Sequence, residues 1–156
     1  MKILMCIAAA LALLGPLPGC STAGRIDTDG SSDLYQKPSA YNFRFVGFDG
    51  DIDEPDSDRR SYYKVYIDKS DEGRTTTGLE SQEKVFESSL SPNRHLVTVE
   101  KWVLDQKSGR YVKLNNIEQP KPNFVYFTLP EDRIVIIRLK SLRNGTAEYL
   151  VDFERK

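Results

Sequence analysis

The chain has 156 residues, of which 39% are hydrophobic, and its 22 lysines and arginines nearly cancel its 23 aspartates and glutamates. This length suits one domain with a sizeable core behind a short leader. The net charge of −1 argues against the strongly basic surface that binds nucleic acid or anionic lipid, so we expect no nucleic-acid partner.

The first nineteen residues have the layout of a secretory signal peptide. Lys2 precedes an apolar stretch over residues 3–14, and Gly15 and Pro16 interrupt it. Because a helix needs roughly twenty apolar residues to cross the hydrocarbon core, this stretch is too short for a membrane span. We therefore predict that residues 1–19 are a signal peptide that is removed on export.

The signal ends in Leu17, Pro18, Gly19 and Cys20. These residues resemble the lipobox of bacterial lipoproteins, although Pro18 stands where Ala or Ser is usual. The resemblance implies cleavage between Gly19 and Cys20 and acylation of Cys20, with palmitate among its acyl chains. Two or three such chains anchor a protein stably to a membrane. Ser21 stands where the Gram-negative sorting pattern places Asp in inner-membrane lipoproteins, which favours the outer membrane of a Gram-negative cell envelope.

A polar segment follows the anchor. Residues 21–40 are rich in Ser, Thr, Gly and Asp, and they contain too few apolar side chains to offset the entropy of the chain. Cys6 and Cys20 are the only cysteines, so the mature domain depends on packing rather than on a disulfide. We divide the chain into the signal peptide 1–19, the acylated cysteine with a flexible tether 20–40, and one folded domain 41–156.

From Tyr41 onward the hydrophobic period becomes two, which is typical of half-buried strands. Tyr63, Val65 and Ile67, for example, alternate with polar or aromatic residues. The segments with this pattern are 42–47, 62–67, 83–88, 97–103, 110–114, 123–129, 133–139 and 147–153. Together they predict an all-β domain of about seven to eight strands.

Residues that favour turns separate these segments, namely Asp49-Gly50, Glu72-Gly73, Ser108-Gly109 and Asn144-Gly145. The pair Glu72-Gly73 is predicted to form a hairpin turn. A short helix would fit only within residues 80–90, where Glu80 and Glu83 are expected on the surface. Short strands without helices predict an antiparallel, immunoglobulin-like β-sandwich, with a small barrel as the alternative.

Three stretches carry a further resemblance: residues 65–68, Val-Tyr-Ile-Asp; residues 73–76, Gly-Arg-Thr-Thr; and residues 90–99, from Leu90 to Val99. They resemble the PEGA domain, a small β-sandwich of bacterial and archaeal envelope proteins. Lys69 stands where the family has Gly, Thr76 replaces its Pro, and Asn93-Arg94 replaces a pair that contains Gly. The resemblance implies a PEGA-like envelope scaffold or ligand-presenting module, and it brings no catalytic residues.

The acidic run after residue 48 offers Asp49, Asp51 and Asp53 as candidate calcium ligands, because calcium prefers carboxylate oxygens. The EF-hand pattern fails, since Glu54 replaces the required Gly and Arg60 replaces the bidentate Glu. The alternative is a solvated acidic hairpin loop whose charge is offset by Arg59 and Arg60. No metal site and no cofactor are assigned.

His95 is the only histidine, and a metal site or catalytic triad generally needs further partners. We therefore interpret it as a turn or strand-start residue. Without a catalytic set, the chain is predicted to be a non-enzyme.

Aromatic residues are the remaining candidates for a site. Trp102, Tyr62 and Tyr66 would form a ligand-binding face if they pointed outward, since Tyr and Trp combine apolar area with a polar group. Our main hypothesis is a lipid-anchored, non-enzymatic scaffold or protein-interaction module with an envelope protein as partner. The alternative is a glycan-binding or peptidoglycan-binding module that uses this aromatic face.

Overall fold

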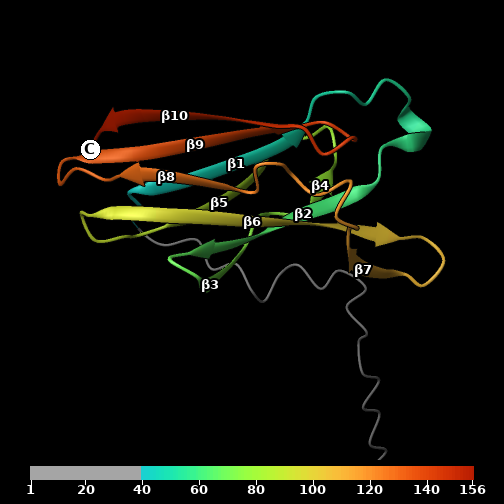
Figure 1. Cartoon of the computed structure of the whole chain (residues 1–156), viewed down its shortest axis with the longest axis horizontal. Coiled ribbons are helices and arrows are strands. Elements are labelled where there is room, and N and C mark those ends of the chain that lie inside the picture. The colour runs from blue at the N-terminus through green and yellow to red at the C-terminus, as the bar shows by residue number, and fades with distance from the viewer. Residues whose placement is uncertain (1–39) are drawn as a thin grey trace, which may run out of the picture.

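A computed structural model describes residues 40–156, which form two β-sheets packed face to face (Figure 1). The predicted signal peptide, Gly19, Cys20 and nearly all of the tether lie outside these residues. In the described part, no helix is long and apolar enough to cross a membrane. The elements are β1 Phe43–Asp49, η1 Pro55–Ser57, β2 Arg60–Ile67, β3 Ser70–Arg74, β4 Gly78–Leu79, β5 Lys84–Ser88, β6 Arg94–Asp105, β7 Arg110–Lys113, β8 Phe124–Thr128, β9 Arg133–Ser141 and β10 Ala147–Arg155.

The smaller sheet has the strand order β10-β9-β1-β5. The larger sheet has the order β3-β2-β6-β7, with β4 also paired to β2 and β8 also paired to β6. All strand pairs are antiparallel except β1 with β9, which run parallel. The predicted all-β sandwich is therefore confirmed.

Each of the eight predicted strand segments lies on a strand, and β5 occupies the stretch in which a short helix was possible. Two further strands, β3 and β4, were missed. The sequence of β3, Ser-Asp-Glu-Gly-Arg, has no apolar alternation, and β4 has only two residues. Both are held by backbone pairing to β2, which leaves no trace in the hydrophobic pattern.

The predicted hairpin turn at Glu72-Gly73 is wrong. The turn between β2 and β3 lies at Asp68 and Lys69, whose φ angles of 51° and 72° match a tight two-residue hairpin turn. Gly73, with φ 129°, instead pairs with Val65 beside an irregularity in the register of β2 and β3. Glycine permits this backbone conformation within a strand as well as in a turn. The presence of Gly73 was therefore wrongly taken to indicate a turn.

The inward side chains of the two sheets form one apolar core. Phe43 of β1 stacks on Phe127 of β8 with ring centroids 5.6 Å apart, and Phe45 meets Tyr63 edge to face at 5.9 Å. These contacts join the smaller sheet to the larger one. The buried hydrophobic residues of the core are Phe43, Phe45, Tyr63, Val65, Ile67, Phe86, Val97, Val99, Phe127, Leu129, Val135, Ile137, Leu139 and Ala147.

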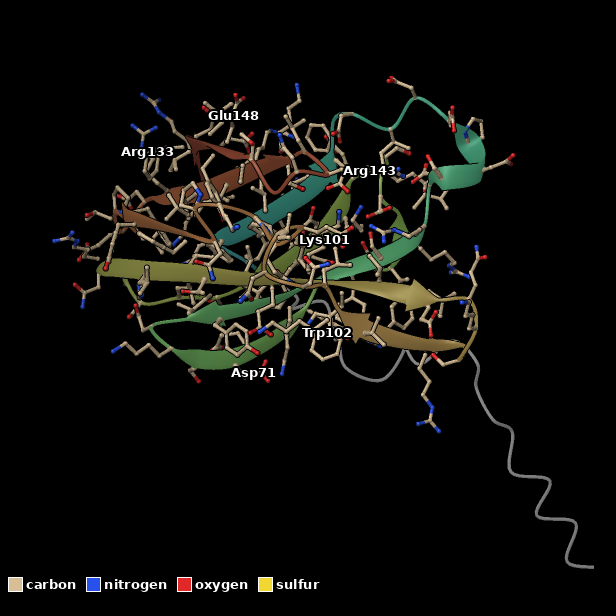
Figure 2. The ribbon with its side chains drawn as sticks, turned by 45° about the vertical axis from the view of Figure 1, so that its right-hand side comes forward. Asp71, Lys101, Trp102, Arg133, Arg143 and Glu148 are labelled. Atoms are coloured by element: carbon tan, nitrogen blue, oxygen red, sulfur yellow. The ribbon has the colours of Figure 1, made fainter. Side chains whose placement is uncertain are left out.

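One end of this core is ionic. The side chain of Lys101 in β6 is buried between the sheets, where its Nζ contacts Asp49 and lies 2.8 Å from Glu80 Oε1 (Figure 2). Arg59 closes the group by a bidentate pair with Glu80, from Nε to Oε2 at 3.0 Å and from Nη2 to Oε1 at 2.9 Å. The charges of Lys101, Asp49 and Glu80 are therefore compensated inside the domain.

Tyr63 connects the ionic end to the apolar core. Its hydroxyl donates to Asp49 Oδ1 at 3.1 Å and lies 3.0 Å from Ser141 Oγ. Burial and the nearby charge of Asp49 raise the pKa of Tyr63. A Cβ atom at Gly47 would lie only 2.6 Å from Tyr63 Cε2, so this glycine provides the space that the ring occupies.

The buried network corrects three expectations. Asp49 and Glu80 were expected in solvated loops, but both are buried because they fall on inward positions next to Lys101. Arg59 was expected to offset the acidic loop, but it pairs with Glu80 and, at 3.2 Å, with Glu118.

We expect Glu80→Gln to lower the free energy of unfolding at pH 7 by about 3 kcal/mol, because it leaves buried cations short of a carboxylate. Burial alone would raise the pKa of Glu80, but the hydrogen bond from Arg59 and the charge of Lys101 lower it to about 2. The carboxylate thus contributes stability above pH 4.5 that is lost as pH falls toward 2. Urea denaturation at several pH values between 4.5 and 2 measures this loss. The free energy of unfolding should fall less over this range in Glu80→Gln than in the wild type.

Glu83→Gln is the matched control. Glu83 pairs with Arg138 at 3.3 Å on the surface, where solvent screens the interaction. Its substitution should change stability by less than about 1 kcal/mol. Equal effects of the two substitutions would contradict the structural role given to the buried network.

Candidate functional site

A pocket of about 460 Å³ lies on the outer face of the larger sheet, on the side away from the core. Figure 2 shows two of its residues, Trp102 and Asp71, on the outside of the layer, whereas Lys101 points between the sheets. The pocket is lined by residues of β2, β3 and β6 and the volume lies in the range of small-ligand sites. Its lining residues are Tyr62, Lys64, Asp71, Glu72, Gly73, Arg74 and Trp102.

Strand alternation places the aromatic wall of this pocket. Because Tyr63 and Lys101 point inward, their neighbours Tyr62 and Trp102 must point outward. The two residues lie directly opposite each other on β2 and β6, and their rings stack nearly parallel with centroids 6.1 Å apart. The ring of Tyr111 in β7 also approaches Tyr62, with centroids 5.0 Å apart. The three rings form one aromatic cluster on the outer face of β2, β6 and β7.

Arg74, the last residue of β3, covers the Tyr62 ring with its guanidinium carbon 4.9 Å from the ring centroid. Burial raises the pKa of Tyr62, and the charge of Arg74 partly opposes that rise. Although its side chain is charged, Arg74 is only 7% exposed. Sequence reasoning missed it because β3 itself carried no recognisable strand pattern.

Both acidic and basic side chains border the pocket. Lys64, which lies between Tyr62 and Tyr66 on the outer side of β2, pairs with Asp71 Oδ2 at 2.7 Å. The other carboxylate oxygen of Asp71 accepts from the backbone N–H of Gly73 at 3.2 Å. The site thus combines aromatic surface with donors and acceptors, which equips it to bind a ligand with both ring faces and polar groups.

The structure places all three predicted aromatic residues on one face, but it distinguishes among them. Tyr62 is only 8% exposed because its neighbours cover it, and Trp102 is half-buried. Tyr66 lies outside the pocket, and its hydroxyl donates to Glu100 Oε2 at 3.2 Å. Trp102 is therefore the residue whose ring can contact a ligand in the pocket.

The three candidate calcium ligands are not brought together. Asp49 points inward to Lys101, Asp51 accepts from the backbone N–H of Arg143 at 2.9 Å, and Asp53 is exposed. Within residues 40–156, no three acidic, His or Cys side chains form a group that could hold a metal ion.

His95 is buried at the start of β6 and fastens the β2–β3 turn to that strand. Its Nδ1 lies 2.7 Å from Asp68 Oδ2, and its Nε2 lies 2.8 Å from the carbonyl oxygen of Ser91. Since both acceptors need an N–H, the doubly protonated ring suits this position best. Burial lowers the pKa of His95, but Ser91 and Asp68 together raise it above the ordinary 6.5.

We expect Asp68→Asn to lower the pKa of His95, because burial would then act without the compensating carboxylate. In the wild type, the stability from this contact is present below pH 6.5 and is lost as pH rises through the folded-state pKa. An NMR titration of the His95 ring measures this pKa in the wild type and in Asp68→Asn. A pKa unchanged by the substitution would contradict the assigned contact.

Comparison with known proteins identifies no relative: no family model matches the chain, and no curated protein or solved structure matches it significantly.

Proposed function

We propose that this chain is a lipid-anchored lipoprotein of the bacterial cell envelope whose sandwich domain is a non-enzymatic module that binds envelope glycan. The pocket beside Trp102 is the observation that carries the proposal, because an aromatic ring flanked by polar groups suits the C–H face and the hydroxyls of a sugar. The lipobox-like end of the leader supports the anchor at Cys20. Ser21 supports an outer-membrane location in a Gram-negative cell.

The resemblance to PEGA domains fits this proposal. Lys69 adopts φ 72°, in the left-handed region that favours glycine, at the position where the family pattern has Gly. Residues 90–99, which carry part of the resemblance, lead into β6, a strand of 12 residues that begins at Arg94. These features support an envelope module of PEGA-like architecture.

A protein-interaction scaffold is the second candidate, and a different part of the same face favours it. Phe124 and Tyr126 of β8 are exposed, and their rings meet edge to face at 5.9 Å. Exposed aromatic pairs are common anchors of protein interfaces. An envelope protein could therefore bind beside the glycan site.

We expect Cys20→Ser to release the full-length protein from the membrane without unfolding its sandwich. Because the net charge is −1, attachment would depend on the acyl chains rather than on basic residues. Membrane fractionation followed by circular dichroism of the released protein tests both parts. Cys6→Ser is the control, since Cys6 lies inside the predicted signal peptide. A Cys20→Ser protein that stayed in the membrane fraction would refute the anchor.

Trp102→Ala is expected to reduce retention on purified peptidoglycan sacculi by about tenfold, because truncation of a central aromatic contact costs more than about 1 kcal/mol and tenfold corresponds to about 1.4 kcal/mol. Cosedimentation of the acylated protein in detergent measures it. Phe153→Ala is the matched control, since Phe153 is an exposed aromatic residue on β10, at the edge of the other sheet. Equal retention of wild type and Trp102→Ala would overturn glycan binding at this pocket.

A further inference from the structure

Arg74 holds two unsatisfied donors at the pocket. Its Nε and Nη2 are both buried, and neither has a hydrogen-bond partner among the described residues. These two nitrogens form one edge of the guanidinium group, called here the Arg74 fork, which can donate two parallel hydrogen bonds to a single carboxylate. A charged donor that is buried without an acceptor is unfavourable. The fork is therefore completed when a ligand supplies the acceptor.

Arg59 shows what this edge binds when an acceptor is present. Its Nε and Nη2 donate to the two carboxylate oxygens of Glu80 at 3.0 and 2.9 Å. Arg74 has the same two nitrogens at an even more buried position, where only 7% of the residue is exposed. A carboxylate is thus the group that matches the Arg74 fork in charge and in geometry.

Neither of the two carboxylates that line the pocket binds the Arg74 fork. Asp71 is held by Lys64 at 2.7 Å and by the backbone N–H of Gly73 at 3.2 Å. Glu72 is exposed, and within residues 40–156 it does not bond to either nitrogen of the Arg74 fork. Both carboxylates instead border the pocket as acceptors for groups such as hydroxyls.

The chain also fixes the fork in place. Beyond Arg74, Thr75 donates its backbone N–H to the carbonyl oxygen of Tyr63 at 2.9 Å, and Thr76 donates to that of Val85 at 2.9 Å. These bonds attach the end of β3 to both sheets. The guanidinium also lies over Tyr62, which holds the side chain of Arg74 at the wall of the pocket.

We propose that this pocket binds an acidic sugar, with the carboxylate of the sugar on the Arg74 fork and its ring against Trp102. Hydroxyls of the ring would donate to Asp71 and Glu72. The inference rests on the proposed glycan-binding function and adds the chemical class of the ligand. A neutral sugar leaves the fork empty, so the carboxylate determines specificity.

Trp102 provides the readout, because it is the only tryptophan of the chain. The acylated mature protein in detergent is titrated with sodium glucuronate, with glucose and with sodium propionate while tryptophan fluorescence is recorded. We expect a saturable change with glucuronate and at least about tenfold weaker binding of the other two, since each supplies only half of the recognised features. Equal binding of glucose, equal binding of propionate, or no change with glucuronate would overturn the proposal.

Arg74→Lys tests the fork itself. Lysine keeps the positive charge but cannot donate from two fixed nitrogens, so we expect at least about tenfold weaker binding of glucuronate. Arg94→Lys is the matched control, because Arg94 also lies over a tyrosine of the larger sheet, 5.0 Å from the Tyr126 ring, but is exposed. Circular dichroism checks folding, and the three-ligand comparison on the wild type decides the proposal even if Arg74→Lys does not fold.

The two proposals fail in different ways. If sacculi require Trp102 but glucuronate binding is the same in wild type and Arg74→Lys, glycan binding stands and the acidic-sugar assignment falls. If glucuronate binds through Arg74 but sacculi are not retained, the acidic-sugar site stands and peptidoglycan is the wrong glycan.

Discussion

The buried ionic group around Lys101 constrains the rest of the domain. The buried ammonium of Lys101 is compensated by two carboxylates, Asp49 from β1 and Glu80 from the segment before β5. Moving Lys101 to solvent would require β6 to slip by one residue. That slip would also turn Val97 and Val99 out of the core, so apolar packing and ion pairing select the same register. Together they hold the two sheets in one alignment.

The outer face follows from this register. Residues adjacent to an inward position must point outward, so the burial of Tyr63 and Lys101 places Tyr62 and Trp102 on the outer face of neighbouring strands. Direct pairing then places the two rings opposite each other. Strand β3 pairs with the edge of β2 that faces away from β6, and Arg74 lies directly opposite Lys64 in that pair. This pairing brings Arg74 to the two rings. The pocket is therefore built by strand pairing that the core already requires.

The alternation of β-branched and aromatic residues was sufficient to predict eight of the ten described strands and the sandwich, because burial of one sheet face leaves that pattern. It gave Tyr62, Tyr66 and Trp102 as candidates for a common face but did not decide whether they point outward. The ionic end was not recognised, although the parity that turns Phe45 and Val99 inward also turns Asp49 and Lys101 inward. The charge of these residues was taken as a sign of solvation. Arg74 left no comparable signal, since β3 depends on backbone pairing rather than on apolar side chains.

Two arginines of this domain have hydrogen-bond partners that their burial does not explain. Arg59 is partly exposed and has both nitrogens of its carboxylate-binding edge satisfied by Glu80. Arg74 is more deeply buried, yet the same edge has no partner in residues 40–156. Because an unpaired charge costs more when it is buried, the more buried arginine would be expected to have the better hydrogen-bond partners. The cation–π contact of Arg74 with the Tyr62 ring does not satisfy these two donors. The presence of an arginine there is accounted for when a bound carboxylate completes its hydrogen bonds.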